Sequence, residues 1–520
     1  MRTADPDTHA VLIDGESLTI DAMRRVAELA APVGICESAV ARVARSRALL
    51  EVLVERNIPV PGVTTGLGAT ASLRVDPSKE VELQTNLVRS HSAGVGPMFA
   101  EDEARAVVAA RLNTLAKGHS AVRPEILDRL ALYLNEGVTP AIPEIGSLGA
   151  GGDLTPLAHV ASTLIGEGHV LCDGRRQETG RVLRELGVPP LRLRFKEGLA
   201  LITGTSAMAG LGSLVVGRAF TQVRQAEIVS ALLNDVLCGS TSPFLAEGHD
   251  VAQPHRGQVE SAANMRLLLE GDGLPPEHTA QRREPRREYT LRAVPQILGA
   301  VRDTLRDAKE RLEIELNSAN DDPLFFESGE IFHGANFHGQ SIAFAMDFVT
   351  IALTQLGVLA ERQVNRVLDR HLNHGLPEGL VAAEPGVHRG FAGAGCPATA
   401  LVAENRTIGP ASVQSVPSGG DHQDVVSVGL IAARNARRVL QNNDRVLAVT
   451  FLATAQAVDV SRRYESLRPA SRTTYDAVRS LVPALGVDRS MAGDIELVAA
   501  ALSRGEFLGS VAREEGIALR

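Results

Sequence analysis

The chain has 520 residues, with 53 Lys and Arg against 62 Asp and Glu, so its formal net charge is −9. Hydrophobic residues make up 44% and charged residues 22%, a composition that is typical of globular proteins and excludes a disordered chain. Trp is absent, and Tyr and Phe number 4 and 13, so aromatic platforms for stacking bases are scarce. Together with the acidic balance, this argues against a nucleic-acid partner, which is held by neutralising its phosphates.

Cysteines and apolar runs indicate the compartment. The 4 cysteines are widely spaced and form no CxxC pair, which indicates reduced thiols rather than a disulfide framework or a zinc site. The N-terminus has no basic stretch followed by an apolar run, so we expect no secretory signal. The most apolar stretch, 198–220, is interrupted by Thr203, Thr205 and Arg218, which indicates a buried helix rather than a membrane span. We expect a cytoplasmic protein with no membrane partner.

The first 200 residues alternate between helical patterns and loops. Two segments, 59–68 and 137–153, are rich in Gly, Pro and Thr, which is the chemistry of loops. Between and around them, apolar residues recur at three- and four-residue spacing, which predicts amphipathic helices. These helical patterns cover 19–57, 81–89, 104–116 and 123–135.

Beyond residue 200 the helical patterns become long. Such lengths exceed the usual globular helix and are typical of a bundle, and strand signals are few and short. We therefore predict an all-α (mainly α) fold with a bundle of long, near-parallel helices. The predicted long helices are 201–233, 293–317, 342–368 and 425–458. The predicted division is an N-terminal domain with the Gly-rich loops (1–200), a central bundle (201–480) and a C-terminal helical segment (481–520).

Several motifs follow one another along the chain. Taken alone, the Gly-rich run EIGSLGAGGDLTPLAH (Glu144–His159) is a weak signal, because a tight turn before a helix explains it. It is accompanied by LQTNLVRSHSAGVG (Leu83–Gly96), REYTLRAVPQ (Arg287–Gln296), GANFHG (Gly334–Gly339) and PASVQSVPSGGDHQDVVS (Pro410–Ser427). In this order and at these separations, the set closely resembles the histidine/aromatic amino-acid ammonia-lyase and 2,3-aminomutase family.

This resemblance covers the chain from about Leu18 to beyond Asp459. It implies an all-α, ammonia-lyase-like fold assembled as a homotetramer, with active sites shared between subunits. It also implies an electrophile, methylideneimidazolone (MIO), which forms when an Ala-Ser-Gly tripeptide cyclises and loses two waters. Its exocyclic methylidene captures the substrate amine and turns it into a leaving group.

Three positions depart from the family pattern. The tripeptide is Ala150-Gly151-Gly152, and because Gly151 has neither Cβ nor hydroxyl, we predict that MIO cannot form and that no cofactor is present. Pro61 stands where the family has the Tyr that removes the β-proton, and Pro cannot act as an acid or base. Thr203 replaces the family Asn that holds the cofactor ring and the substrate carboxylate.

Other family positions are retained. Arg292 matches the Arg that clamps the substrate carboxylate, and Tyr289, three residues earlier, shares its helix face. Gln423 replaces the Glu of many histidine-specific members, which disfavours histidine as a substrate. We predict Tyr289 and His91 as catalytic residues, and Arg292, Phe337, Gln423, Thr203 and Asn317 as substrate-binding residues.

Two clusters keep alternative interpretations. Extra cations close to Arg292 either favour an anionic ligand or form a solvated loop face; they are Arg282, Arg283, Arg286 and Arg287. His333 and His338 are five residues apart, which does not match a helical zinc pair, so we predict no metal site.

Three functions are consistent with these residues. The first is a lyase-like enzyme that acts on an amino acid or a related small carboxylate without MIO, by hydration, isomerisation or cyclisation. The second is an inactive relative that binds a carboxylate or a partner protein, including mixed assembly with a competent paralogue. The third is a conventional aromatic amino-acid ammonia-lyase or aminomutase. The first is the favoured prediction.

Overall fold

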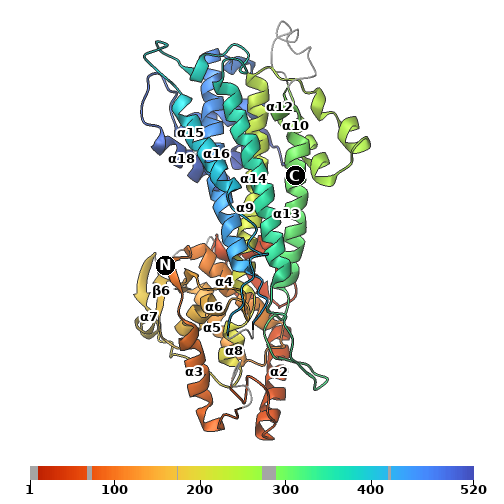
Figure 1. Cartoon of the computed structure of the whole chain (residues 1–520), viewed down its shortest axis with the longest axis vertical. Coiled ribbons are helices and arrows are strands. Elements are labelled where there is room, and N and C mark those ends of the chain that lie inside the picture. The colour runs from red at the N-terminus through yellow and green to blue at the C-terminus, as the bar shows by residue number, and fades with distance from the viewer. Residues whose placement is uncertain (1–9, 67–72, 173, 272–287, 420–422) are drawn as a thin grey trace. The chain divides into compact units, whose positions relative to one another are not determined.

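Helices dominate the computed structural model of this chain, which describes residues 10–66, 73–172, 174–271, 288–419 and 423–520 (Figure 1). The predicted mainly α-helical class is confirmed. The chain divides into two units. The first consists of Met1–Gly217, Ala308–Asp347 and Pro410–Arg434, and the second of Arg218–Asp307, Phe348–Gly409 and Asn435–Arg520.

In the first unit, short strands frame a group of medium-length helices. The helices are α1 (Ile20–Ala27), α2 (Glu37–Glu55), α3 (Glu80–His91), α4 (Glu101–Ala116), α5 (Pro124–Asn135), α6 (Leu154–Leu164), α7 (Thr179–Glu185) and α8 (Glu197–Ile202). The strand pairs are parallel β1 (Val11–Ile13) with β2 (Val33–Ile35), and antiparallel β3 (Val95–Met98) with β5 (Pro143–Ile145) and β8 (Leu324–Phe325) with β9 (Ile331–Phe332). A three-stranded sheet has the order β4 (Thr139–Pro140), β6 (His169–Cys172) and β7 (Arg175–Glu178).

Helix α4 forms the centre of the first unit. Its residues from Glu103 to Ala116 are all buried, as expected for a helix that is surrounded by other elements on every side. Most of these buried residues are Ala, Val and Leu, and Glu103 accepts a hydrogen bond from the Ala100 amide at the helix start. Two polar side chains within the helix, Arg111 and Asn113, are fully buried and donate hydrogen bonds to distant segments.

Four long helices run through segments of both units. They are α9 (Ser206–Val236), α13 (Val294–Leu316), α14 (Gln340–Leu368) and α16 (Gly429–Ser461). Within the second unit, buried hydrogen bonds join α9, α14 and α16: Gln222 Nε2 donates to Leu440 O (2.9 Å) and Asn443 Nδ2 donates to Leu353 O (2.6 Å). In the described part of this unit, the other α-helices are α10 (Arg256–Leu268), α12 (Tyr289–Arg292), α15 (Ala392–Arg406), α17 (Pro469–Leu481), α18 (Ala492–Ser503) and α19 (Glu506–Glu515).

Helix α14 has the length and apolar composition of a membrane span, alone among the helices in the described residues. Of its most apolar window, 67% is buried inside the structure, and the core helix of a soluble protein passes the same test. The prediction that the chain has no membrane partner stays a prediction.

The observed elements differ from the predicted ones at two places. The helix predicted over 201–233 is interrupted, because α8 ends at Ile202 and α9 begins at Ser206, with Gly204 at a φ of 130°. The predicted division into 1–200, 201–480 and 481–520 also differs from the observed units. The long helices each supply residues to both units, and α18 and α19 pack with α17 in the second unit instead of forming a separate segment.

We predict that Gly299→Ala destabilises the second unit. Helices α10 and α13 approach so closely that a Cβ at position 299 would lie 2.4 Å from Gln258 Cα, and one at Gly257 would lie 2.1 Å from Gly299 O. The added methyl must push backbone apart, so we expect the free energy of unfolding to fall by about 1–3 kcal/mol in denaturant titrations. Gly393→Ala is the matched control, because position 393 is also helical and has nothing within 4 Å. Equal stability of the two variants would contradict the prediction.

Candidate active site

The Gly-rich loop lies between β5 and α6, at residues 146–153 of the first unit. Gly149, Gly151 and Gly152 have φ values of 80°, 69° and 84°, a region that favours glycine. The Gly152 amide donates to Gly149 O (3.2 Å), so the loop folds back on itself before α6 begins.

This loop pairs with the segment that interrupts the predicted helix. Gly204 N donates to Gly151 O (3.3 Å), and Asp153 N donates to Gly204 O (2.7 Å). A Cβ at Gly152 would lie 2.3 Å from Gly204 O, so the two backbones meet where no side chain fits. The pairing places Thr203 next to the tripeptide Ala150-Gly151-Gly152.

Arg111 holds the Thr203–Gly204 segment from the side of α4. Its guanidinium is fully buried and donates through Nη1 to Ala200 O (2.9 Å) and Thr203 O, and through Nη2 to Asn320 Oδ1 (2.7 Å). Burial lowers the pKa of Arg111 to about 10, so it still carries its charge at neutral pH. A Cβ at Gly204 would lie 2.5 Å from Asn320 Oδ1, which shows how closely this support fits.

A buried ion pair fixes the start of α8. Lys196 Nζ lies 2.5 Å from Asp321 Oδ2, both side chains are fully buried, and Ser120 Oγ donates to Asp321 Oδ1 (2.7 Å). Lys196 Nζ also donates to Asp322 O (3.0 Å). Each carboxylate oxygen of Asp321 therefore has a partner, which offsets part of the cost of removing the charges from water.

The sequence prediction missed this support. Its members are Arg111, Lys196, Glu315, Asn320 and Asp321. Two sequence features point to it: an Arg and an Asn inside an apolar helix, and the polar run NSANDDP (Asn317–Pro323), of which the prediction includes Asn317 alone.

Asp153 closes the loop and connects it to α9. Its Oδ1 accepts from Ser147 Oγ (2.8 Å) and its Oδ2 accepts from the Met208 amide (2.8 Å) near the start of α9. Complete burial raises the pKa of Asp153 to about 6, and these hydrogen bonds only partly oppose that effect.

Three buried hydroxyl groups around the loop have no hydrogen-bond partner among the described residues. They are Thr203 Oγ1, Ser206 Oγ and Ser427 Oγ. Ser427 lies against the loop, because a Cβ at Gly149 would lie 2.4 Å from its Oγ, and the adjacent Val428 amide donates to Leu148 O (3.0 Å). Buried hydroxyls without partners are costly in free energy, so this arrangement suits a polar ligand at the loop.

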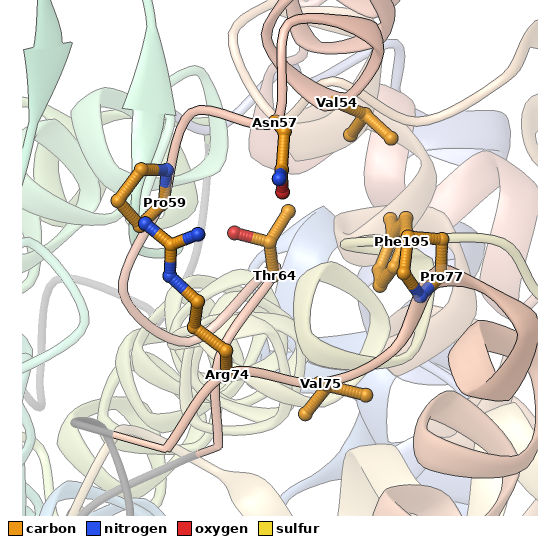
Figure 2. A pocket seen from close by; sticks show the side chains of 8 residues that line it. All are labelled: Val54, Asn57, Pro59, Thr64, Arg74, Val75, Pro77 and Phe195. Carbon is orange, nitrogen blue, oxygen red and sulfur yellow. The ribbon is translucent and has the colours of Figure 1, made fainter.

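The first predicted loop contains an exposed Pro61. Near it, Val60 N donates to Thr64 Oγ1 (2.8 Å), so Thr64 braces the turn. Figure 2 shows the side chains of Asn57, Thr64 and Arg74 directed toward one another across a cleft of about 20 Å³. This is room for about one water, so the cleft is too small for an amino acid.

The remaining predicted residues of the first unit have different surroundings. His91, at the end of α3, places Nδ1 2.9 Å from Leu87 O, and Phe337 is half-buried. Gln423 Oε1 accepts from Ser418 Oγ (2.7 Å). The amide of Asn317 is fully engaged with Leu18, Asn113 and Glu313, which leaves no donor for a substrate.

Tyr289 and Arg292 belong to the second unit. They lie on α12, and the Arg292 guanidinium carbon is 4.9 Å from the centre of the Tyr289 ring. The stacking confirms that the two residues share one helix face. The four predicted arginines, Arg282, Arg283, Arg286 and Arg287, lie outside the described residues.

Comparison with known proteins assigns the chain to a family. The sequence profile of the family described as aromatic amino acid lyase matches residues 18–480, and the chain belongs to this family. It is 69% identical to the MIO-dependent tyrosine 2,3-aminomutase of Streptomyces globisporus and 52% identical to the tyrosine ammonia-lyase of Cupriavidus metallidurans. These matches cover 98% of each chain in the first case, and 99% of this chain and 100% of the relative in the second. The crystal structure of the Streptomyces globisporus tyrosine aminomutase matches with a TM-score of 0.94 at 67% identity, over 98% of this chain and 100% of that one.

These relatives contradict two predictions. The prediction of a MIO-independent enzyme with altered chemistry is wrong, because a full-length relative at 69% identity is a MIO-dependent aminomutase. The prediction of no cofactor is wrong for the same reason, and MIO is the group to expect at this loop. The conventional aromatic lyase or aminomutase, the third function considered, is the one that the relatives support.

Residue 151 is where the chain departs from that expectation. Gly151 has no Cβ from which a methylidene could form, so the tripeptide of this sequence does not fit MIO. The three atoms nearest to a Cβ at position 151 all belong to the Leu154 side chain, at 3.2–3.4 Å, so this side chain would have to shift slightly, and the φ of 69° adds backbone strain. No chemical step through MIO follows from these residues.

We predict that Asp153 makes stability depend on pH. Its pKa is raised in the folded state from 3.8 to about 6, so its contribution to stability is complete below pH 3.8 and is lost as the pH rises through 6. Relative to Asp153→Asn, the free energy of unfolding should therefore fall by about 3 kcal/mol over this window. Denaturant titrations of both proteins from about pH 3 to about pH 7, roughly one unit beyond each limit, measure the difference. Parallel curves across the window would contradict the assignment.

Proposed function

We propose that this chain is an aromatic amino-acid aminomutase or ammonia-lyase whose substrate is tyrosine or a close analogue. The observation that carries the proposal is the 69% identity to a tyrosine 2,3-aminomutase over 98% of both chains. The retained pair of Tyr289 and Arg292 supports it, because the planar guanidinium suits bidentate binding of a carboxylate.

The proposed roles follow from the chemistry of each side chain. Arg292 binds the substrate carboxylate. The Tyr289 hydroxyl acts as an acid or base and transfers a proton near that carboxylate. His91 contacts the substrate, and its Nδ1 is oriented by Leu87 O (2.9 Å). Phe337 and Gln423 contact the aromatic part of the substrate, and Gln423 disfavours histidine. Thr203 offers its unpartnered hydroxyl to the ligand at the Gly-rich loop.

We also propose that the chain assembles as a homotetramer. In the second unit, α14 exposes Phe348 and Ile351, and in the first unit Val413 and Val416 are exposed. Large apolar side chains exposed close together in the chain are typical of surfaces that another subunit covers.

Turnover of tyrosine tests the proposed function. The chain and two variants, Gly151→Ser and Gly151→Ala, are incubated with tyrosine, phenylalanine and histidine, and the β-amino acid and the unsaturated acid are quantified by chiral chromatography. We expect Gly151→Ser to give products from tyrosine and none from histidine. Gly151→Ser should raise the yield and show an intact mass reduced by two waters, because it supplies the missing Cβ and hydroxyl.

Gly151→Ala is the matched control for that assay. It adds a Cβ at the same φ of 69° but no hydroxyl, so it carries the same backbone strain without the chemistry. Because Pro61 occupies the predicted base position, Pro61→Tyr is added to Gly151→Ser and should raise turnover further. The absence of tyrosine binding and of products in every folded variant would refute the proposal.

A further inference from the structure

Helix α12, which carries Tyr289 and Arg292, is held from one side by α14 within the second unit. Glu288 precedes the helix as its N-cap, yet its side chain makes no capping hydrogen bond. Glu288 Oε1 lies 2.9 Å from Arg366 Nη1 of α14 instead. Arg366 Nε also donates to Thr290 Oγ1 (3.0 Å), so one guanidinium contacts both residues that flank Tyr289.

A second residue of α14 reinforces this contact. Gln363, one helical turn before Arg366, donates through Nε2 to Thr290 O (3.1 Å) and to Ser230 Oγ of α9 (2.9 Å). Both the side chain and the backbone of Thr290 are therefore fixed to α14. The next residue, Leu291, is buried.

The opposite face of α12 carries the functional pair. Residues three apart lie on the same helix face, which places Tyr289 and Arg292 together and Thr290 on the other side. Tyr289 is 71% exposed, and Arg292 stacks against its ring. A helix of four residues has few internal hydrogen bonds, and it is joined to α13 through Ala293, so these contacts with α14 help to set its direction.

The contact between Arg366 and Glu288 is more than a solvated surface pair. The Arg366 side chain is 10% exposed, and burial lowers its pKa while Glu288 and Asp369 oppose that effect. His374 Nε2 lies 3.8 Å from the same Glu288 oxygen. Loss of one partner from a largely buried pair leaves the other uncompensated, so such contacts influence structure more than exposed pairs do.

We propose that Arg366 is a positioning residue for the substrate carboxylate. Through Glu288 and Thr290 it sets the direction of α12, and with it the direction of the Arg292 guanidinium. The inference rests on the proposed function, in which Arg292 binds the carboxylate.

Binding of tyrosine and of tyramine, its analogue without the carboxylate, tests this role by calorimetry. With Arg366→Met we expect the affinity for tyrosine to fall about tenfold while the affinity for tyramine stays unchanged. A merely structural role would weaken both ligands equally. Arg362→Met is the control, because Arg362 lies one turn earlier on α14, is half exposed and pairs with Glu361.

A double-mutant cycle with Arg292→Ala decides whether Arg366 acts through Arg292. If it does, Arg366→Met has no further effect on tyrosine affinity once Arg292 is replaced. If Arg292→Ala lowers the affinity for tyrosine and Arg366→Met does not, the inference is wrong and the proposed function stands. If Arg292→Ala itself has no effect, the proposed function fails. If Arg366→Met does not fold, Glu288→Gln is used instead. It removes the charge of the same ion pair with a side chain of nearly the same size, and the same changes in affinity are expected.

Discussion

The close approach of two glycines, Gly152 and Gly204, is the constraint on which the first unit's site depends. A Cβ on either residue would collide with the opposing backbone or with its support. Because no side chain separates the two segments, their amides and carbonyls pair directly, and Thr203 lies next to the tripeptide. Arg111 stabilises this close approach. Its guanidinium donates hydrogen bonds to two carbonyls at the end of α8 and to the side-chain oxygen of Asn320.

The same constraint organises the neighbouring elements. The interruption after Ile202 leaves the N–H and C=O of Gly204 without partners in a helix. Both groups form hydrogen bonds with the Gly-rich loop instead. Asp153 then receives the Met208 amide near the start of α9, so one long helix begins at the site. The polar atoms left over are the hydroxyls of Thr203, Ser206 and Ser427, which surround the loop and suit a polar ligand.

The sequence predicted the fold class and the family, but not the support of the site. Apolar periodicity predicts helices because a helix forms from residues that are neighbours in the sequence. The motifs identified the family because several of them occur in the family's order and spacing. The break at Thr203–Gly204, the clamp by Arg111 and the choice of Asn320 over Asn317 depend on contacts between residues about 90 to 210 positions apart, which no local pattern encodes. The cofactor prediction rested on Gly151 alone, and nearly full-length similarity to a MIO-dependent relative contradicts it.

Amide hydrogen exchange of Asp153 and Gly204, with and without Arg111→Met, tests most directly whether this clamp organises the site. Both amides donate across the glycine pairing, so we expect strong protection in the unaltered chain. In Arg111→Met both should exchange about tenfold faster or more, while amides of α16 in the second unit keep their protection. Unchanged exchange of Asp153 and Gly204 in a folded Arg111→Met protein would contradict the central role of this interaction.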